Sequence, residues 1–168
     1  EQHNLGSGVI FDSAGHVLTN WHVIAKASRI SVILVDDRTF EAELVGSDPT
    51  TDLAVLKIKT DEKLPFVPLG ESGDLMIGET IIAIGNPFGF SHTVTTGVIS
   101  ATNRSFQSEG QVFHDFIQLD ASINPGNSGG PLLDINGRLI GINTAIYSAA
   151  QGIGFAIPIS KVRRVVDD

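Results

Sequence analysis

Short apolar runs rich in β-branched residues recur along this chain and alternate with polar stretches. Each run is short for a helix and is bounded by Gly, Pro, Asn, Asp or Ser. The pattern predicts β-strands separated by turns, which is the arrangement of an all-β barrel or sandwich. The predicted strands cover residues 8–11, 17–20, 30–35, 53–58, 80–84, 93–100, 116–119, 139–144 and 155–157.

A different spacing of apolar residues marks the end of the chain. Residues 161–168 predict a terminal helix, because Val162, Val165 and Val166 fall on one face of it. Ser160 is the expected N-cap, since its hydroxyl can accept a hydrogen bond from a free backbone N–H of the first turn. The sequence therefore predicts a short helix that packs on the strands.

Three further segments interrupt the strand pattern. Residues 21–27 predict a single short helical turn directly after a strand. The less apolar stretch that starts at Glu71 predicts a linker between two lobes. The polar residues 103–111 predict a mobile surface loop.

The composition limits the classes of protein. The chain has 168 residues, of which 42% are hydrophobic, so one domain or two small lobes with a real core are expected. A formal net charge of −8 argues against a nucleic-acid binder, which presents a basic face. The absence of cysteine excludes disulfides, thiolate zinc sites and cysteine nucleophiles. No apolar run approaches the roughly 18 residues of a membrane span, and no signal peptide is visible.

The strongest candidate for chemistry is the run Gly126-Asn127-Ser128-Gly129-Gly130-Pro131. A serine hydroxyl becomes an effective nucleophile beside a base and near donors for the oxyanion that it creates. Taken alone, the run is equally a glycine-rich turn before a strand. Its Gly-x-Ser-x-Gly spacing also matches the nucleophile elbow of α/β-hydrolases. That fold places its histidine after the serine, and no histidine follows Ser128, which excludes it.

His22 and Asp52 are the best-placed partners for Ser128. His22 follows an apolar strand and opens a helical turn, which holds its ring in place. Asp52 stands at the head of an apolar strand, where a buried carboxylate can orient a histidine. A buried core histidine and a turn cap are the plainer interpretations. The order His22, Asp52, Ser128 is that of chymotrypsin-type enzymes on an all-β scaffold.

Other kinds of site are disfavoured by the sequence. The histidines are scattered, and none forms a two-histidine helical motif, so we expect no metal site and no cofactor. Residues 85–90 contain glycines but lack the lysine of a P-loop and precede strand-like sequence. A phosphate-binding loop is therefore not predicted.

Six motifs resemble, in the same order, those of the HtrA (Deg) serine proteases, from about Gly6 to the C-terminus. The resemblance implies one trypsin-like protease domain over residues 1–168, an all-β fold of the chymotrypsin/trypsin type with two six-stranded β-barrels. We expect an N-terminal barrel over about 1–70, a linker over 71–77, a C-terminal barrel over 78–158 and a short helix over 160–168. The motifs are Thr19-Asn20-Trp21-His22-Val23-Ile24, Thr51-Asp52-Leu53-Ala54-Val55-Leu56-Lys57-Ile58, Ile84-Gly85-Asn86-Pro87-Phe88-Gly89, Asn124-Pro125-Gly126-Asn127-Ser128-Gly129-Gly130-Pro131-Leu132, Gly141-Ile142-Asn143-Thr144-Ala145 and Gly154-Phe155-Ala156-Ile157-Pro158.

The resemblance implies a catalytic role for each matched residue. Ser128 is the nucleophile, His22 the general base and then acid, and Asp52 the carboxylate that orients the histidine. The oxyanion hole consists of the loop Gly126, Asn127 and Ser128, through the backbone N–H groups of Gly126 and Ser128.

The walls of the S1 pocket, which receives the P1 side chain of a substrate, are also implied by the resemblance. They are Ile123, Thr144, Ala145 and Ile146. Because these side chains are apolar or bulky, we expect a shallow pocket that prefers Val, Ile or Ala and rejects Lys and Arg.

The family resemblance also implies a cellular role. It predicts ATP-independent cleavage of unfolded or damaged polypeptides, in protein quality control under stress, in the bacterial periplasm or cell envelope. Unfolded polypeptides are the expected partners, with no nucleic acid and no membrane segment. The alternative is an isolated or resting protease domain that acts mainly as a chaperone-like binding module.

Three departures from the family pattern modify these expectations. Asn127 replaces the aspartate that pairs with a cut N-terminus in digestive relatives, so we expect activation by ordering of loops 103–111 and 147–152 instead. The family's first strand and trimer contacts precede Gly6, so the first barrel is expected to be incomplete or closed differently, and a homotrimer is left undecided. The family's PDZ domains follow the protease domain, so peptide sensing through them is not expected within these residues.

Overall fold

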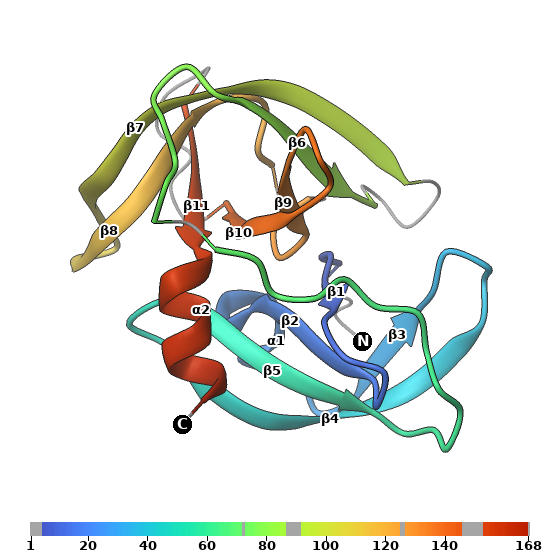
Figure 1. Ribbon diagram of the computed structural model, residues 1–168. Coiled ribbons are helices and arrows are strands. Elements are labelled where there is room, and N and C mark those ends of the chain that lie inside the picture. The colour runs from blue at the N-terminus through green and yellow to red at the C-terminus, as the bar shows by residue number, and fades with distance from the viewer. Residues whose placement is uncertain (1–4, 72, 87–91, 125–126, 146–152, 168) are drawn as a thin grey trace.

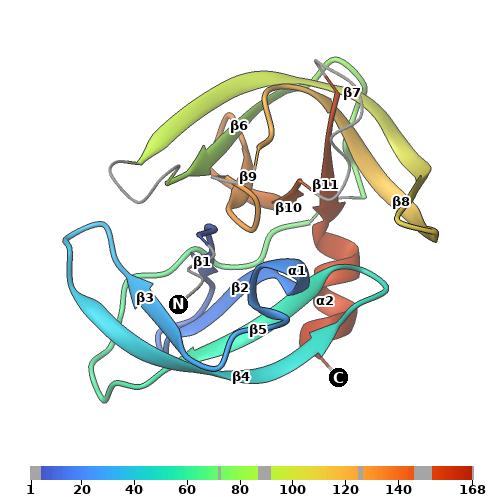
Figure 2. The same cartoon turned by 180° about the vertical axis from the view of Figure 1, so that it is seen from behind.

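The computed structural model describes residues 5–71, 73–86, 92–124, 127–145 and 153–167. Its strands form two antiparallel sheets that face each other, with a C-terminal helix beside both (Figure 1). The view from behind shows the same helix reaching from one sheet to the other (Figure 2). The predicted all-β fold class with a short C-terminal helix is confirmed.

The first sheet has five strands in the described part of the chain, in the order β1-β2-β5-β4-β3, and is not closed. This is one strand fewer than a six-stranded barrel. Its middle strand β5 is apolar because both faces are covered, and Leu53, Ala54 and Ile58 are fully buried. The elements are β1 (Val9–Ile10), β2 (His16–Asn20), α1 (Trp21–Ile24), β3 (Ile30–Ile33), β4 (Thr39–Asp48) and β5 (Leu53–Ile58).

The second sheet closes into a six-stranded barrel in the order β10-β11-β8-β7-β6-β9. Aliphatic side chains from all around the barrel fill its interior, among them Ile81, Ile99, Leu119 and Leu132, each fully buried. Closure gives each of the six strands two neighbours in the barrel, so none of them is an edge strand of the barrel itself. The strands are β6 (Thr80–Gly85), β7 (Thr93–Ser108), β8 (Gln111–Asp120), β9 (Pro131–Asp134), β10 (Leu139–Thr144) and β11 (Gly154–Pro158).

The stretch 103–111 is a β-hairpin, so the prediction of a mobile loop there is wrong. β7 continues to Ser108, and a two-residue turn with both φ angles positive leads into β8. Phe106 anchors the hairpin, with ring centroids 5.1 Å from Phe116 and 4.3 Å from Phe155. One buried aromatic ring in an otherwise polar stretch is enough to fix the hairpin against the barrel.

One apolar cluster joins the two sheets and the C-terminal helix. Leu18 and Leu53 of the first sheet share it with Leu139 and Ile142 of the barrel, and all four are fully buried. Burial of this kind contributes about 25 cal/mol for each Å² of apolar surface removed from water. The two halves therefore share a core, and the surface between them is fixed.

Helix α2 (Ile159–Val166) closes the shared core. Ile159 and Val162 are fully buried on its inner face, as the spacing of valines predicts in part. The expected N-cap at Ser160 is wrong: the N-cap is Pro158, two residues earlier, and it makes no side-chain capping bond. Arg163 on the outer side donates hydrogen bonds to the carbonyl groups of Leu69 and Gly70. The segment just before the predicted linker is thus tied to the helix.

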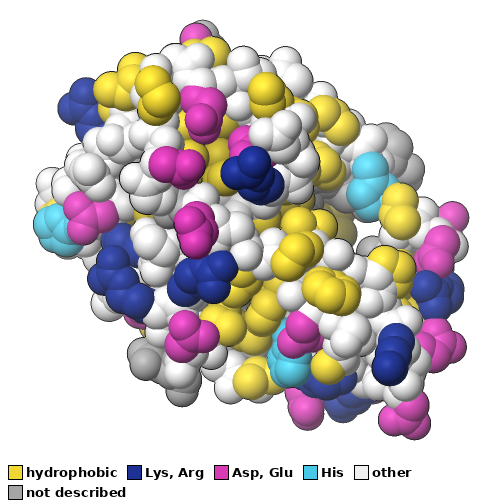
Figure 3. Space-filling model, in the orientation of Figure 1, with side chains coloured by type: hydrophobic (Ala, Val, Ile, Leu, Met, Phe, Trp, Pro, Cys, Tyr) yellow, Lys and Arg dark blue, Asp and Glu magenta, His cyan; other side chains and the backbone are white. Residues whose placement is uncertain are grey.

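The molecular surface carries charges of both signs. On the face shown in Figure 3, Lys and Arg side chains are interspersed with Asp and Glu. No helix in the described ranges is long and apolar enough to cross a bilayer.

Candidate active site

His22 and Asp52 form a close pair at the end of the first sheet. β2 ends at Asn20 and α1 starts at the next residue, which places His22 in the first turn. His22 Nδ1 lies 2.6 Å from Asp52 Oδ2, and the His22 backbone N–H donates to Oδ1 at 2.9 Å. A carboxylate at Nδ1 fixes the tautomer with the hydrogen on Nδ1. His22 Nε2 is then an acceptor.

The backbone of Asp52 adopts a left-handed conformation, with φ of 60°. A non-glycine residue in this region costs of order 1–3 kcal/mol and persists where the surroundings enforce it. Here the carbonyl oxygen of Asp52 accepts hydrogen bonds from Asn20 Nδ2 at 3.1 Å and from the Trp21 N–H at 3.0 Å. The conformation thus directs both the carbonyl and the carboxylate of Asp52 to the β2–α1 junction.

Ser128 comes from the other half of the molecule and meets this pair. Its Oγ lies 3.4 Å from His22 Nε2. The hydroxyl donates to Asn20 Oδ1 and accepts the N–H of Ala145 at 3.0 Å. Ser128 is fully buried. The structure therefore brings the three predicted residues together, two from the first sheet and one from the barrel.

The amide side chain of Asn127 fixes the loop that carries Ser128. Its Oδ1 accepts the Asn124 N–H at 2.9 Å, and its Nδ2 donates to the Ser122 carbonyl at 3.0 Å. A neutral amide can satisfy both neighbours at once, whereas a carboxylate can only accept. The loop is therefore held by contacts within itself.

The predicted oxyanion donors are partly engaged within this loop. The Asn124 carbonyl accepts the N–H of Asn127 at 3.2 Å and that of Ser128 at 3.1 Å. An oxyanion hole needs its N–H groups aimed at the position of the developing charge. Gly126, the other predicted donor, lies outside the described residues.

Gly129 lets the serine loop dock on the first sheet. Its φ is 91°, and a Cβ built there would lie 2.1 Å from the Ser7 carbonyl oxygen. The Ser7 N–H donates to the Ser128 carbonyl at 2.9 Å, and the Thr19 hydroxyl donates to the Ser7 carbonyl at 2.8 Å. Only glycine combines this backbone angle with so close an approach.

The described residues among the predicted S1 walls each make a different kind of contact. Ile123 is half-buried against Gly154, where an added Cβ would come within 2.5 Å of Ile123 Cγ1. The Thr144 hydroxyl donates to Asp52 Oδ2 at 2.9 Å, so this side chain is directed to the carboxylate. Ala145 contributes its N–H to Ser128 Oγ. Ile146 lies outside the described residues, as does the predicted activation loop 147–152.

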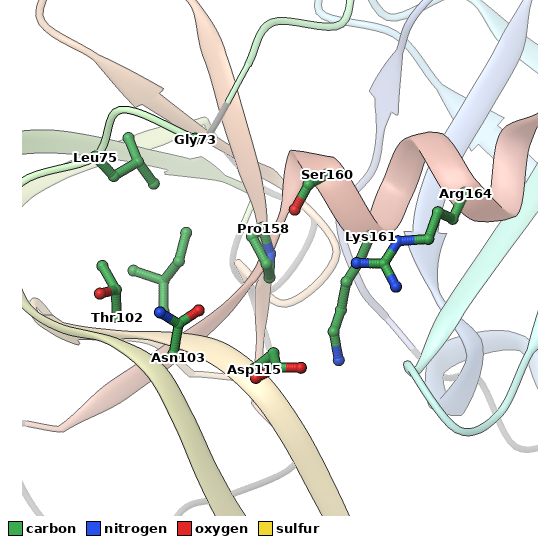
Figure 4. A pocket seen from close by; sticks show the side chains of 10 residues that line it. Gly73, Leu75, Thr102, Asn103, Asp115, Pro158, Ser160, Lys161 and Arg164 are labelled. Carbon is green, nitrogen blue, oxygen red and sulfur yellow. The ribbon is translucent and has the colours of Figure 1, made fainter.

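A pocket of about 330 Å³ lies away from these residues, between β7, β8 and α2 (Figure 4). Asp115, Lys161 and Arg164 are among the side chains that line it, and none of His22, Asp52 and Ser128 does. Burial lowers the pKa of Lys161, and Asp115 partly offsets this effect. The described residues hold no group of three or more His, Asp or Glu side chains placed to bind a metal ion.

Asn20 is the site residue whose contacts the sequence did not reveal. In the sequence it is only one residue of the motif Thr19–Ile24, yet in the structure it touches both Ser128 and the backbone of Asp52. The one available signal is a polar residue at the end of an apolar strand, next to the histidine.

Most of the chain matches a known protein family. Residues 6–142 match the trypsin-like peptidase domain family. The chain belongs to this family. The order and the spatial meeting of His22, Asp52 and Ser128 agree with membership, because the trypsin-like fold builds its site between two β-domains.

Individual relatives confirm the resemblance to HtrA (Deg) proteases. The chain is 54% identical to Protease Do-like 1, chloroplastic, of Arabidopsis thaliana, over 96% of this chain and 38% of the relative. It is 56% identical to a probable periplasmic serine endoprotease DegP-like of Chlamydia trachomatis, over 96% of this chain and 33% of the relative. Among solved structures, HtrA-type protease AlgW with tripeptide superposes with a TM-score of 0.88 at 55% identity, covering 96% of this chain and 54% of that one. The chain thus spans between a third and two fifths of these two curated relatives.

Proposed function

We propose that this domain is a serine endopeptidase that cleaves unfolded polypeptides, with His22, Asp52 and Ser128 as its triad. The observation that carries the proposal is the position of the His22 ring, 2.6 Å from Asp52 on one side and 3.4 Å from Ser128 on the other. The similar proteins are named as proteases or endoproteases, which supports the same reaction here. A chaperone-like module without hydrolysis is the less favoured alternative.

The first chemical step acylates Ser128. His22 Nε2 takes the hydroxyl proton while Oγ attacks the substrate carbonyl carbon, and the Asp52 carboxylate stabilises the imidazolium that forms. His22 then gives this proton to the leaving amine. The Oγ–Nε2 distance of 3.4 Å has to shorten first. Catalytic hydrogen bonds are often long in the free enzyme and tighten in the substrate complex.

The oxyanion of the tetrahedral intermediate needs two backbone donors. We assign this role to the N–H groups of Gly126 and Ser128. Because the Ser128 N–H donates to the Asn124 carbonyl in the free structure, this bond has to be given up when substrate arrives. One oxyanion donor contributes about 10²- to 10³-fold in kcat. Water then attacks the acyl-enzyme, with His22 as base and Ser128 as leaving group.

Ile123 and Ala145 suit a small apolar P1 side chain. Ile123 lies against the backbone of Gly154, and Ala145 contacts Ser128 Oγ. Neither side chain offers a charge to a cationic P1 residue. A peptide with P1 Val should therefore be cleaved faster than the same peptide with P1 Arg, and the opposite ranking would contradict this assignment.

The cellular setting is also part of the proposal. The similar proteins include periplasmic DegP-like proteases and a chloroplastic one. We place this domain in the cell envelope of a bacterium, with unfolded polypeptides as its substrates.

Digestion of an unfolded protein tests the proposal. Reduced, carboxymethylated α-lactalbumin should be degraded by this chain, and the native disulfide-bonded form should resist. Ser128→Ala should lower the rate by a factor on the order of 10⁶. Degradation by Ser128→Ala at a rate near that of the unaltered chain would overturn the triad. Suppression of aggregation with no cleavage by either form would favour the binding module.

A further inference from the structure

The Ser128 hydroxyl is bonded to groups other than His22 in this structure. It donates to Asn20 Oδ1 and accepts the Ala145 N–H at 3.0 Å, while His22 Nε2 lies at 3.4 Å. A hydroxyl has one hydrogen to donate and two lone pairs with which to accept. The hydrogen that His22 would need is therefore already given to Asn20.

The orientation of the Asn20 amide is fixed by its other neighbour. Its Nδ2 donates to the Asp52 carbonyl oxygen at 3.1 Å, and this oxygen can only accept. The opposite orientation would set two acceptors against each other. Asn20 is fully buried at the end of β2, and the next residue, Trp21, donates its N–H to the same carbonyl at 3.0 Å. The amide oxygen therefore faces Ser128 and no water replaces it.

His22 and Asn20 compete for a single hydrogen. Because His22 Nδ1 faces the Asp52 carboxylate at 2.6 Å, Nε2 carries no hydrogen and can only accept from Ser128. The Asn20 oxygen is an acceptor at a shorter distance. The hydroxyl can donate to one of the two at a time, and rotation about the Cβ–Oγ bond of Ser128 moves the hydrogen from one acceptor to the other.

We propose that Asn20 is a positioning residue that holds the Ser128 hydroxyl in a resting orientation, in competition with His22. The inference rests on the proposed function, since it concerns the same nucleophile. Attack then begins with rotation of the hydroxyl from Asn20 to His22, a change of hydrogen-bond partner in which no covalent bond forms or breaks. The populations of the two orientations set the fraction of molecules ready to react.

Substitutions of Asn20 that act in opposite directions test this inference. Asn20→Ala removes the competing acceptor, so Ser128 should react faster with a small alkyl fluorophosphonate, by up to about tenfold for one hydrogen bond. Asn20→Asp supplies a stronger, charged acceptor and should slow the reaction. A residue with a merely structural role would slow the reaction in both variants, and that result would overturn the proposal. If the proposed function itself fails, the unaltered chain is not labelled at Ser128 at all.

A double-mutant cycle measured by unfolding tests the hydrogen bond between Asn20 and Ser128 independently of activity. The variants are Asn20→Ala, Ser128→Ala and the double variant, each followed by urea unfolding. Because both single variants lose the same hydrogen bond, the change in the unfolding equilibrium constant of the double variant should differ from the product of the two single changes by up to about tenfold. Asn136→Ala in an exposed turn, combined with Ser128→Ala, is the matched additive control. Additive effects for Asn20 and Ser128 would overturn the proposal.

The unaltered chain provides the answer if the Asn20 variants do not fold. A buried hydroxyl in a hydrogen bond exchanges slowly enough to give its own proton resonance. The resonance of the Ser128 hydroxyl should show a nuclear Overhauser effect to the Asn20 side-chain amide. An effect to the His22 ring alone would contradict the resting orientation.

Discussion

The Thr144 hydroxyl on β10 donates a hydrogen bond of 2.9 Å to Asp52 Oδ2, across the interface between the two sheets. The same oxygen lies 2.6 Å from His22 Nδ1. Thr144 and Asp52 are both almost fully buried, so water does not replace either contact. The barrel thereby positions the carboxylate that orients a histidine on the other sheet.

Replacement of Thr144 by valine should show the value of this contact. Thr144→Val keeps the shape and removes a hydrogen bond to a charged group, so the free energy of unfolding should fall by about 1.5–3 kcal/mol. We expect kcat to fall and KM to stay, because this hydroxyl faces Asp52 and not the substrate. Urea unfolding and peptide hydrolysis measure both. Thr96→Val, at an exposed position of β7, is the control. Equal changes in unfolding free energy and in kcat for the two variants would contradict the assignment.

Gly129 is the position where an added methyl group should be most harmful to the site. Gly129→Ala combines about 1–2 kcal/mol of left-handed strain with a collision at 2.1 Å with the Ser7 carbonyl. Gly137→Ala is the matched control, since its φ is also positive at 79° and nothing lies within 4 Å of the new Cβ. Thermal unfolding should show a larger fall in stability for Gly129→Ala than for Gly137→Ala. Peptide hydrolysis should fall in Gly129→Ala and stay unchanged in Gly137→Ala. Equal destabilisation would mean that the loop can move away from the first sheet.

Phe106 tests the hairpin of β7 and β8. Phe106→Ala removes a buried ring that packs between Phe113 and Phe155, and should cost about 3–5 kcal/mol of unfolding free energy. Val112 lies on the same hairpin and is 48% exposed, so Val112→Ala should cost far less. Denaturant unfolding compares them. A small effect at Phe106 would instead support a mobile loop at residues 103–111.

Asp48, in the turn before Asp52, should make the stability of the folded chain depend on pH. Burial raises the pKa of Asp48, but hydrogen bonds from Thr50 and Thr51 outweigh it, and the pKa lies below its usual value. A lowered folded-state pKa means that the stabilisation is present above the unfolded pKa of about 3.9 and is lost as the pH falls through the folded pKa. The stability advantage of the unaltered chain over Asp48→Asn should therefore shrink below about pH 3.9. An advantage that is constant from pH 7 to pH 2 would contradict this origin.

Much of the site could be predicted because its signals are local. His22 and Asp52 each stand at the end of a clear apolar run, and Ser128 lies in a glycine-rich run. The absence of a histidine after Ser128 then left one order of residues on an all-β scaffold. The structure brings these three residues together, as that order requires.

Contacts between distant segments could not be predicted in the same way. Asn20 meets Ser128 across 108 residues of sequence, and Thr144 meets Asp52 across 92. Both residues stand in motifs of the family resemblance, but nothing in the sequence pairs Asn20 with Ser128 or Thr144 with Asp52. The left-handed backbone of Asp52 is likewise enforced by its tertiary partners.

The hairpin at residues 103–111 was missed for a related reason. Toward its tip most residues are exposed and polar, so this part of the sequence resembles a loop. Phe106 and Phe113 are the apolar side chains near its tip that belong to the core cluster. The start of α2 was misplaced because Ser160 is a common N-cap type, while Pro158 already sets the extended backbone that precedes the helix.

The most direct test of the central claim is labelling of the chain with a fluorophosphonate, followed by peptide mapping in a mass spectrometer. The account predicts one modified residue, Ser128, and no labelling in Ser128→Ala. His22→Ala should be labelled far more slowly, since the base that takes the hydroxyl proton is missing. Modification at another serine, or labelling of Ser128 that is as fast without His22 as with it, would contradict the account.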